Sequence, residues 1–322
     1  MIDGNRVPEV SVIVPARDAV ATLGRTLAAL RHQRFAGDFE VIVVDNGSLD
    51  ATASLAKAAL ARPRVLERPR GEGPAAARNA GVALARAAIL AFTDADCEPS
   101  PGWLAAGVRA LERADIVQGA VAPPPGADLG PFDRTVWVAG ASLYETASLF
   151  VRRDWWERVG GFQELTPGAG KGAPFGEDAW FGWRVRRAGG RAAFCAEARV
   201  HHAVFERDAC GFITERRRFA RFPALAARIP ELRRERFYAG SFLSRRTAAL
   251  DTALLGCALA AAARRPALAV GAAIPYAALV ASSAGRWGPR LGPRVAVAEI
   301  AADLVGAAAL VRGSVAARSL LI

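Results

Sequence analysis

Short β-branched runs alternate with helical patterns over the first third of the chain. The runs Val10–Val14, Glu40–Val44 and Ala88–Phe92 have the length and composition of buried strands, and a shorter one lies at Val65–Leu66. Apolar residues at helical spacing predict helices over about 19–34, 49–60 (with Ser48 as its N-cap) and 73–86. Strands separated by helices of this length form parallel βαβ units with right-handed crossovers. The pattern therefore predicts an α/β domain with a mostly parallel central sheet.

Polar residues follow three of these strands at the point where each strand ends. The three clusters are Pro15-Ala16-Arg17-Asp18, Asp45-Asn46-Gly47 and Asp94-Ala95-Asp96. Ligands of parallel sheets bind at the carboxyl ends of the strands, so these clusters are expected to converge on one binding site. Asp94 and Asp96 face the same way on an extended segment, and their charges repel unless a cation or hydrogen-bond donors lie between them. An acidic turn without a ligand is the alternative for this pair taken alone.

The middle of the chain is less regular. Ala147–Val151 has the pattern of a strand, and Gly168–Gly176 is a glycine-rich loop. Glu177-Asp178 then begins a helix rich in aromatic residues. Carboxylates in a first turn complement the helix dipole, so a purely structural role for this pair remains open.

The last third of the chain is dominated by apolar segments. Ala248–Ala263 and Pro266–Ala284 are close to the shortest length that crosses a bilayer, and Val295–Val311 is interrupted by two acidic residues. A membrane-inserted hairpin, an interfacial attachment and a soluble helical subdomain all remain open. Arginines flank every segment, which favours contact with an anionic cytoplasmic leaflet. We therefore expect a catalytic domain over 1–225 and a helical, hydrophobic, membrane-associated region over 226–322.

Charge and cysteine content narrow the function classes. The net charge is +11, and the 42 basic residues include only two lysines. Zinc-ligand spacing and an aromatic-rich RNA-binding pattern are both missing from the sequence, so nucleic acid is not expected as a partner. The four cysteines form no C-x-x-C pair, which suits a reducing compartment and argues against a disulfide framework or structural zinc. The polar first ten residues lack the apolar core of a signal peptide, so we expect the catalytic part in the cytoplasm.

Eight short motifs, in this order, resemble those of the family 2 glycosyltransferases with the GT-A fold. They lie between Val10 and about Phe222: 12–18, 43–50, 77–81, 93–96, 152–153, 160–162, 176–178 and 201–202. The resemblance implies a nucleotide-sugar donor. It places Pro15, Arg17 and Asp18, with Asp45 or Asn46, at the base and ribose of the donor. Arg78 and Asn79 would lie near the diphosphate. Asp94 would contact ribose or sugar, with Glu177 in the same site. A solvated helix face is the alternative for Arg78.

The same resemblance implies the catalytic groups. Asp96 and His202 would bind a divalent cation, Mn²⁺ or Mg²⁺, which suits carboxylate and diphosphate oxygens. His201 and His202 face opposite ways on a strand, so at most one of them is expected to serve. Asp178 would be the base that accepts the acceptor hydroxyl proton in a single inverting displacement. A Gln-x-x-Arg-Trp motif is missing near 215–222 of the sequence, which favours transfer of one sugar over polymerisation.

The sequence thus predicts an inverting, metal-dependent transferase at the cytoplasmic face of the cell membrane, with a soluble cytoplasmic protein as second choice. A glycan or lipid-linked acceptor, as in cell-envelope synthesis, is suggested only by the hydrophobic last third. A sugar-phosphate nucleotidyltransferase and a non-catalytic membrane scaffold are the alternatives. A nucleotidyltransferase would not account for the Glu177-Asp178 motif. A scaffold would not need Asp94, Asp96 and Asp178 together.

Overall fold

The structure is a computed structural model that describes residues 7–60, 64–69, 71–141, 143–165 and 175–322. Most of the expected glycine-rich loop, 168–174, lies outside these residues. The chain divides into two compact units. Unit 1 comprises Met1–Ala127 and Thr135–Val204, and unit 2 comprises Asp128–Arg134 and Phe205–Ile322. Unit 1 ends before residue 225, and where the catalytic domain ends as a functional unit stays a prediction.

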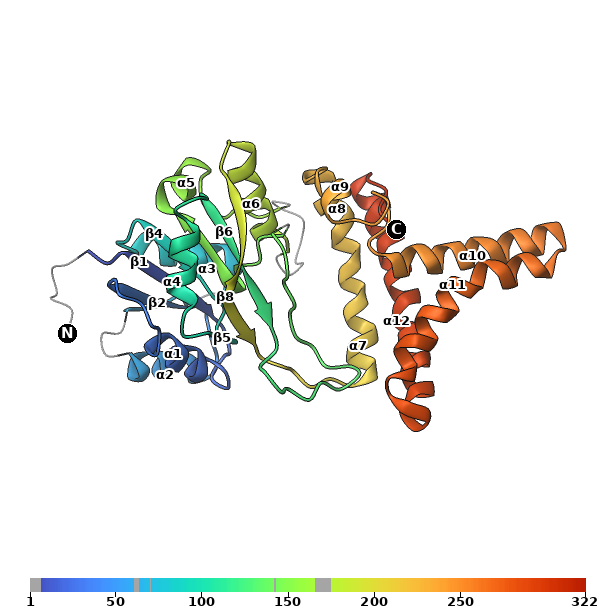
Figure 1. Ribbon diagram of the computed structural model, residues 1–322, viewed down its shortest axis with the longest axis horizontal. Coiled ribbons are helices and arrows are strands. Elements are labelled where there is room, and N and C mark those ends of the chain that lie inside the picture. The colour runs from blue at the N-terminus through green and yellow to red at the C-terminus, as the bar shows by residue number, and fades with distance from the viewer. Residues whose placement is uncertain (1–6, 61–63, 70, 142, 166–174) are drawn as a thin grey trace. The chain divides into compact units, whose positions relative to one another are not determined.

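Unit 1 is built around an eight-stranded sheet with the order β3-β2-β1-β4-β7-β6-β8-β5 (Figure 1). Its strands are β1 (Val10–Ala16), β2 (Phe39–Asp45), β3 (Arg64–Glu67), β4 (Ile89–Phe92), β5 (Cys97–Pro99), β6 (Ile116–Ala122), β7 (Leu149–Arg152) and β8 (Ala192–His202). Parallel pairs join β1 to β2 and β4, β2 to β3, and β6 to β8. β7 and β5 pair antiparallel with their neighbours. The α/β class and the mostly parallel sheet are confirmed.

Helices cover both faces of this sheet. They are α1 (Leu23–Arg31), α2 (Thr52–Ala59), α3 (Pro74–Leu84), α4 (Trp103–Ala110), α5 (Arg153–Arg158) and α6 (Glu177–Arg187). Val12 and Val14 of β1 share a core cluster with Leu27 of α1, whereas Ile13 faces α3. A Cβ added to Gly81 of α3 would lie 2.6 Å from Ile13 Cγ2, so this helix rests directly on the sheet. Burial on both faces explains the unbroken apolar run of β1.

The first expected helix is shorter than the sequence pattern indicates. It was expected from about Ala19, but α1 begins at Leu23. The backbone N–H groups of Ala19 and Val20 donate instead to Thr52 Oγ1 (2.8 Å) and Asp50 Oδ2 (3.1 Å). These bonds tie residues 19 and 20 to the segment that follows β2, and the helix begins only after a turn at 19–22.

One further local expectation was wrong, and one strand begins later than expected. Ser48 was expected to cap the second helix, but α2 begins only at Thr52, and Ser48 accepts the N–H of Asp18. The strand expected over 147–151 begins at Leu149 because Thr146–Ser148 form a 3₁₀ turn, η1. β6 and β8 were not predicted.

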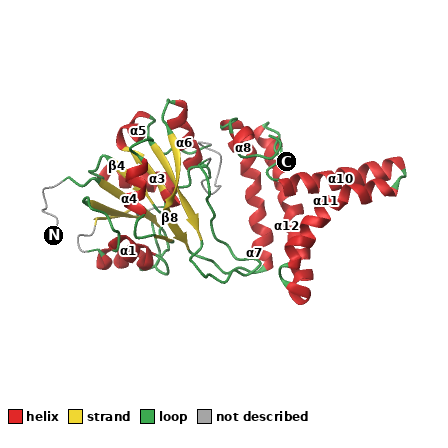
Figure 2. Cartoon of the chain, viewed as in Figure 1, coloured by secondary structure: helices red, strands yellow, loops and turns green. Residues whose placement is uncertain are grey.

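Unit 2 is a set of helices joined by loops (Figure 2). The helices are α7 (Ala209–Glu215), η2 (a 3₁₀ helix, Arg216–Arg221), α8 (Phe222–Arg228), α9 (Leu232–Glu235), α10 (Arg245–Ala263), α11 (Pro266–Gly285) and α12 (Gly288–Ala317). Glycines let η2 lie against α12. A Cβ added to Gly313 would come within 2.2 Å of the Ala220 carbonyl oxygen, and one added to Gly306 within 2.9 Å of the Phe219 ring.

An ion-pair cluster joins the last three helices. Arg246 of α10 pairs with Glu299 (3.0 Å) and Asp303 (2.6 Å) of α12, and the Tyr276 hydroxyl of α11 donates to Asp303 (2.9 Å). The two acidic residues that interrupt the third apolar stretch are therefore paired within unit 2.

The hairpin of α10 and α11 is long and apolar enough to cross a membrane by length and composition. Only 22% of the most apolar window of α10 and 17% of that of α11 is buried. Large apolar side chains are exposed along both helices, among them Leu254, Leu255, Leu259, Leu268, Val270 and Ile274. Two helices of this kind are weak grounds for a span, and how the hairpin meets a membrane stays a prediction.

Candidate active site

The ends of β1 and β2 are joined by the side chains that follow them. The N–H of Asp18 donates to Ser48 Oγ (2.9 Å), and the N–H of Leu49 donates to Asp18 Oδ1 (2.7 Å). Ser48 in turn donates to Asp45. Asp18 has a φ of 48°, in the left-handed region that non-glycine residues rarely adopt, and the reciprocal bonds hold it there. Exposed Arg17 lies beside it, with Nε 3.7 Å from Asp18 Oδ2.

Asn46 binds the start of α3 rather than pointing into open space. Its Nδ2 donates to the Gly73 carbonyl (3.2 Å), and its Oδ1 accepts the N–H of Glu72 (3.3 Å). Pro15 lies within β1 opposite Val44, where its ring can offer only an apolar surface. Whether Asp45 or Asn46 contacts a nucleotide base stays a prediction.

Arg78 connects two carboxylates from distant parts of the sequence. Its guanidinium lies 3.2 Å from Asp94 Oδ1 and 3.0 Å from Glu177 Oε1, and the residue is 6% exposed. Burial acts to lower the pKa of Arg78, but the charges of Asp94, Glu177 and Asp178 raise it overall. The solvated helix face considered for Arg78 is therefore wrong. The residue ties Asp94-Ala95-Asp96, called the D-x-D segment below, to the start of α6.

Asn79 holds a turn. Its Nδ2 donates to the Phe162 carbonyl (2.8 Å), and its Oδ1 accepts the N–H of Phe162 (2.9 Å). Both bonds fix the Gly160-Gly161-Phe162 turn. The phosphate contact expected for Asn79 stays a prediction.

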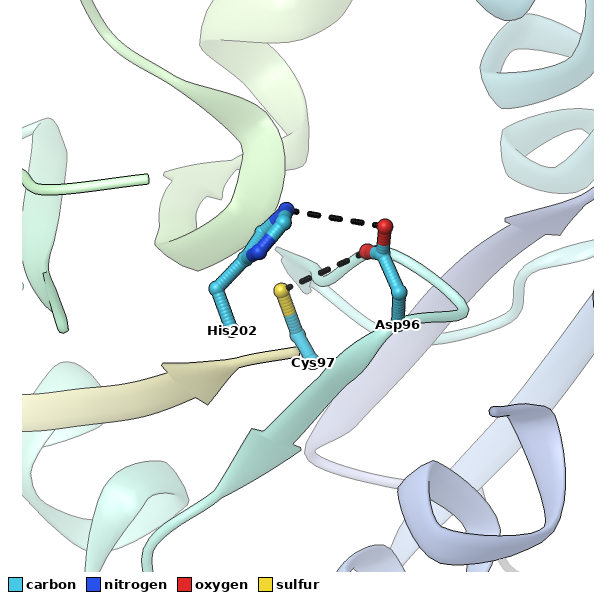
Figure 3. Close-up of side chains that lie close together, drawn as sticks. All are labelled: Asp96, Cys97 and His202. Carbon is cyan, nitrogen blue, oxygen red and sulfur yellow. Dashed lines mark hydrogen bonds and ion pairs between the residues drawn. The ribbon is translucent and has the colours of Figure 1, made fainter. Parts of the chain in front are cut away.

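Asp96, Cys97 and His202 bring three metal-ligating side chains together (Figure 3). β5 and β8 pair antiparallel with Cys97 opposite His202, and Asp96 precedes β5. His202 Nε2 lies 3.5 Å from one oxygen of Asp96, and Cys97 Sγ lies 3.8 Å from the other. Burial raises the pKa of the Cys97 thiol well above its usual range, and the charges of Asp94 and Asp96 add to this. Sequence reasoning did not include Cys97.

The two adjacent histidines point in opposite directions, as expected. His202 Nδ1 lies 2.7 Å from the Ala203 carbonyl, so Nδ1 carries the proton, and Nε2, which faces Asp96, is the acceptor nitrogen of the neutral ring. His201 instead lies beside the Pro123 carbonyl (3.2 Å) and Ser100 (3.4 Å). Of the two histidines, His202 is the one that lies beside Asp96.

Asp178 lies in the first turn of α6 among other charged groups. Burial raises its pKa well above the ordinary value, and the charges of Glu177 and Glu145 add to the shift. The charge of Arg78 and the N–H of Ala179, which donates to Asp178 (2.8 Å), act against it. A carboxylate with a raised pKa is a stronger base than an ordinary one. Glu145 was missed by sequence reasoning because it lies in an irregular segment without any periodic pattern.

These contacts define a class of protein. Asp94, which follows parallel strand β4, is linked through the buried Arg78 to Glu177 in the first turn of α6, beside Asp178. Residues 11–154 match the family described as "Glycosyl transferase family 2", and this part of the chain is similar to that family. The match favours a transferase over the nucleotidyltransferase considered from the sequence.

Known proteins resemble the chain over part of their length. Glycosyltransferase AglE from Haloferax volcanii is 34% identical over 171 residues, covering 48% of this chain and 56% of the relative. A pre-mycofactocin glycosyltransferase from Mycobacterium tuberculosis is 32% identical over 212 residues, covering 60% and 42%. The chain thus spans about half the length of these curated relatives.

A solved structure extends the likeness of the fold. The mannosyltransferase PcManGT from Pyrobaculum calidifontis, in complex with GDP-Man and Mn²⁺, superposes with a TM-score of 0.55. The alignment covers 98% of this chain and 88% of that one, at 20% sequence identity. At this identity the likeness shows a shared fold.

Proposed function

We propose that this chain transfers one sugar from a nucleotide-sugar to an acceptor with the help of a divalent cation, inverting the anomeric centre. The observation that carries this proposal is the arginine link. Arg78 contacts Asp94 of the D-x-D segment and Glu177 beside Asp178, so the proposed cation side and base side belong to one site. This link supports one site shared by the D-x-D pair and Glu177-Asp178 over two separate acidic turns.

On the donor side, the residues fit a hard cation and a diphosphate. Asp96 and His202 would hold Mn²⁺ or Mg²⁺, because one offers carboxylate oxygen and the other an imidazole lone pair. The bound cation would neutralise charge on the leaving diphosphate. Asp94 would bind ribose or sugar, with Arg78 and Asn79 near the phosphates. Pro15, Arg17, Asp18, Asp45 and Asn46 would surround base and ribose. The complex of PcManGT with GDP-Man and Mn²⁺ supports this donor class.

On the acceptor side, Asp178 would act as the base. Its carboxylate takes the proton of the acceptor hydroxyl as that oxygen bonds to the anomeric carbon, while the bond to the diphosphate breaks. One displacement from the opposite face inverts the configuration. Glu177 is held by Arg78 and fixes the first turn of α6.

The acceptor and the location follow from unit 2. The exposed apolar side chains of α10 and α11, with flanking arginines, support contact with the cytoplasmic face of the membrane. A lipid-linked or cell-envelope glycan would meet the enzyme there. A soluble cytoplasmic protein remains the second choice.

A thermal-shift screen tests the donor proposal. A ligand that binds the folded state raises the unfolding temperature, so nucleoside diphosphates should stabilise the protein more with Mn²⁺ than without it. Asp96→Asn should remove the Mn²⁺-dependent part of the shift. Glu112→Gln, on the exposed turn after α4, is the control and should leave it intact. If the shift in unfolding temperature depended neither on Mn²⁺ nor on the Asp96→Asn change, the cation site would be misassigned.

A further inference from the structure

We propose that Asp96, Cys97 and His202 form a site for a borderline divalent cation of the Zn²⁺ or Co²⁺ kind, in which the Cys97 thiolate is a ligand. The inference shares its location with the proposed function and concerns which cations that location accepts. Cysteine spacing in the sequence argued against structural zinc, since the chain has no C-x-x-C pair. The structure builds the ligand set from two strands instead.

The strand register places the three side chains together. Cys97 and His202 are opposite each other on antiparallel strands, so both side chains project from the same face of the sheet. Asp96 directly precedes Cys97, and its carboxylate lies 3.5 Å from His202 Nε2 and 3.8 Å from Cys97 Sγ. All three ligand atoms fall within 4.8 Å of one another (Figure 3).

These separations suit a tetrahedral cation. With metal–ligand bonds of about 2.0 Å to nitrogen and oxygen and about 2.3 Å to sulfur, neighbouring ligand atoms of a tetrahedron lie roughly 3.3–3.6 Å apart. His202 Nε2 lies 3.5 Å from Asp96 Oδ2 and Cys97 Sγ lies 3.8 Å from Asp96 Oδ1, so a modest rotation of the carboxylate would bring one oxygen towards both other ligand atoms. Three protein ligands leave a fourth position for water or a phosphate oxygen. The side chain of Asp96 is 29% exposed, which provides a route from solvent.

The donor set determines which cations bind. Sulfur ligands select softer ions, whereas oxygen ligands suit Mg²⁺ and Mn²⁺. Asp96 and His202 alone would serve a hard cation, and Cys97 adds the ligand that favours Zn²⁺ or Co²⁺. The thiol gives up its proton to solvent when it binds. Such an ion would bind in the position proposed for Mn²⁺ and compete with it.

Co²⁺ titration followed by absorbance provides the test, because a thiolate bound to Co²⁺ gives a charge-transfer band in the near ultraviolet. We expect the full chain to develop this band, Zn²⁺ to abolish it, and both Cys97→Ser and His202→Ala to lose it. Cys210→Ser, which changes an exposed cysteine, is the matched control and should keep it. No band, or a band that survives Cys97→Ser, would overturn the proposal.

A second measurement needs no variant. X-ray absorption at the zinc edge of the Zn²⁺-loaded wild-type protein should show one sulfur neighbour at about 2.3 Å. A shell of nitrogen and oxygen alone would overturn the inference even if Cys97→Ser failed to fold. The proposed function is judged separately. Mn²⁺-dependent nucleotide binding without sulfur coordination would defeat this inference only, and sulfur coordination without nucleotide binding would defeat the donor proposal only.

Discussion

Arg78 is a buried cation whose position depends on two carboxylates far apart in the sequence. Its ion pairs with Asp94 and Glu177 replace the water that the guanidinium loses on burial. When one partner of a buried pair is removed, the remaining charge stays behind without compensation. Arg78 therefore stabilises the fold of unit 1 as well as joining the proposed donor and acceptor sides.

Replacing Arg78 should be costly for stability. We expect Arg78→Met to lower the free energy of unfolding by about 3–5 kcal/mol, because two carboxylates are left unpaired. Urea unfolding followed by circular dichroism measures the change. Arg113→Met, at an exposed position after α4, serves as control and should stay within about 0.5 kcal/mol of wild type. Equal losses for the two variants would contradict this role.

Asp178 should be needed for transfer and should give the reaction a distinctive pH dependence. Asp178→Asn keeps the shape but cannot take a proton, so we expect turnover to fall about 10²- to 10⁴-fold. Because burial raises the pKa of Asp178, its ionised form is lost at a higher pH than for an ordinary carboxyl. Activity should therefore decline on acidification with an apparent pKa above 3.8.

Lowering the pH should affect stability and activity in opposite directions through Asp178. The neutral acid carries no desolvation cost, so the contribution of Asp178 to folding becomes more favourable as pH falls from the raised pKa towards the ordinary one. Glu145→Gln removes a negative neighbour and should move the acid limb of the rate profile to lower pH. An unchanged limb would mean that another group controls the rate.

At the residue scale, the sequence predicted the groups that lie at strand ends. Asp18, Asp45 and Asp94 each follow a strongly apolar run, so alternation and topology sufficed to place them. Cys97 and Glu145 could not be found in this way. The place of Cys97 depends on the pairing of β5 with β8, and that of Glu145 on how an irregular segment packs near α6. Both are non-local contacts that leave no periodic trace.

At the scale of elements, α6 carries Glu177 and Asp178. The close packing of this helix against Tyr144 determines the position of both carboxylates. A Cβ added to Gly182 would come within 2.1 Å of the Tyr144 ring, which is fully buried. The helix can approach so closely only because position 182 has no side chain. Local packing of this kind has no signal in hydrophobic periodicity.

Gly182→Ala should therefore displace α6. We expect a loss of about 1–3 kcal/mol in unfolding free energy from overpacking, together with slower transfer. Gly24→Ala in α1 meets nothing within 4 Å and should be neutral or stabilising by up to about 1 kcal/mol. Thermal and urea unfolding of the pair provide the measurement. Should Gly182→Ala behave like Gly24→Ala, the tight contact would not be a constraint.

Strands were predicted well where they are buried on both faces and poorly elsewhere. β1 and β2 are nearly continuous apolar runs and could be read directly. β8 was missed because all of its first six residues, Ala192–Glu197, are exposed or half-buried, which leaves no apolar run. Its strand conformation comes from pairing with β6 and β5.

At the scale of the whole molecule, composition predicted the change from an α/β domain to apolar helices. α10 and α11 lie close to the expected stretches 248–263 and 266–284. The sequence could not show that Glu299 and Asp303 are satisfied by Arg246, since this pairing joins separate helices. Because Glu299 and Asp303 are already paired with Arg246, their presence is no argument for or against contact of the neighbouring hairpin with lipid.

Membrane contact should depend on the exposed side chains of the hairpin. We expect the combined change Leu255→Gln, Leu259→Gln and Ile274→Gln to reduce binding to vesicles that contain anionic lipid, because it removes exposed apolar area. Vesicle flotation measures the bound fraction. Val297→Gln with Val315→Gln, on exposed positions of α12, is the comparison and should bind as wild type. Undiminished binding of the hairpin variant would rule out this attachment.

The contact between Arg78 and Asp94 also has a kinetic consequence. A donor that engages Asp94 changes the partner on one side of Arg78, while Glu177 holds the other side next to Asp178. We therefore expect an obligatory order, in which the nucleotide-sugar enters first and the acceptor second. Initial-rate patterns would show it: the nucleoside diphosphate product should compete with the donor but not with the acceptor. Random entry would mean that the two halves of the site act independently despite their shared arginine.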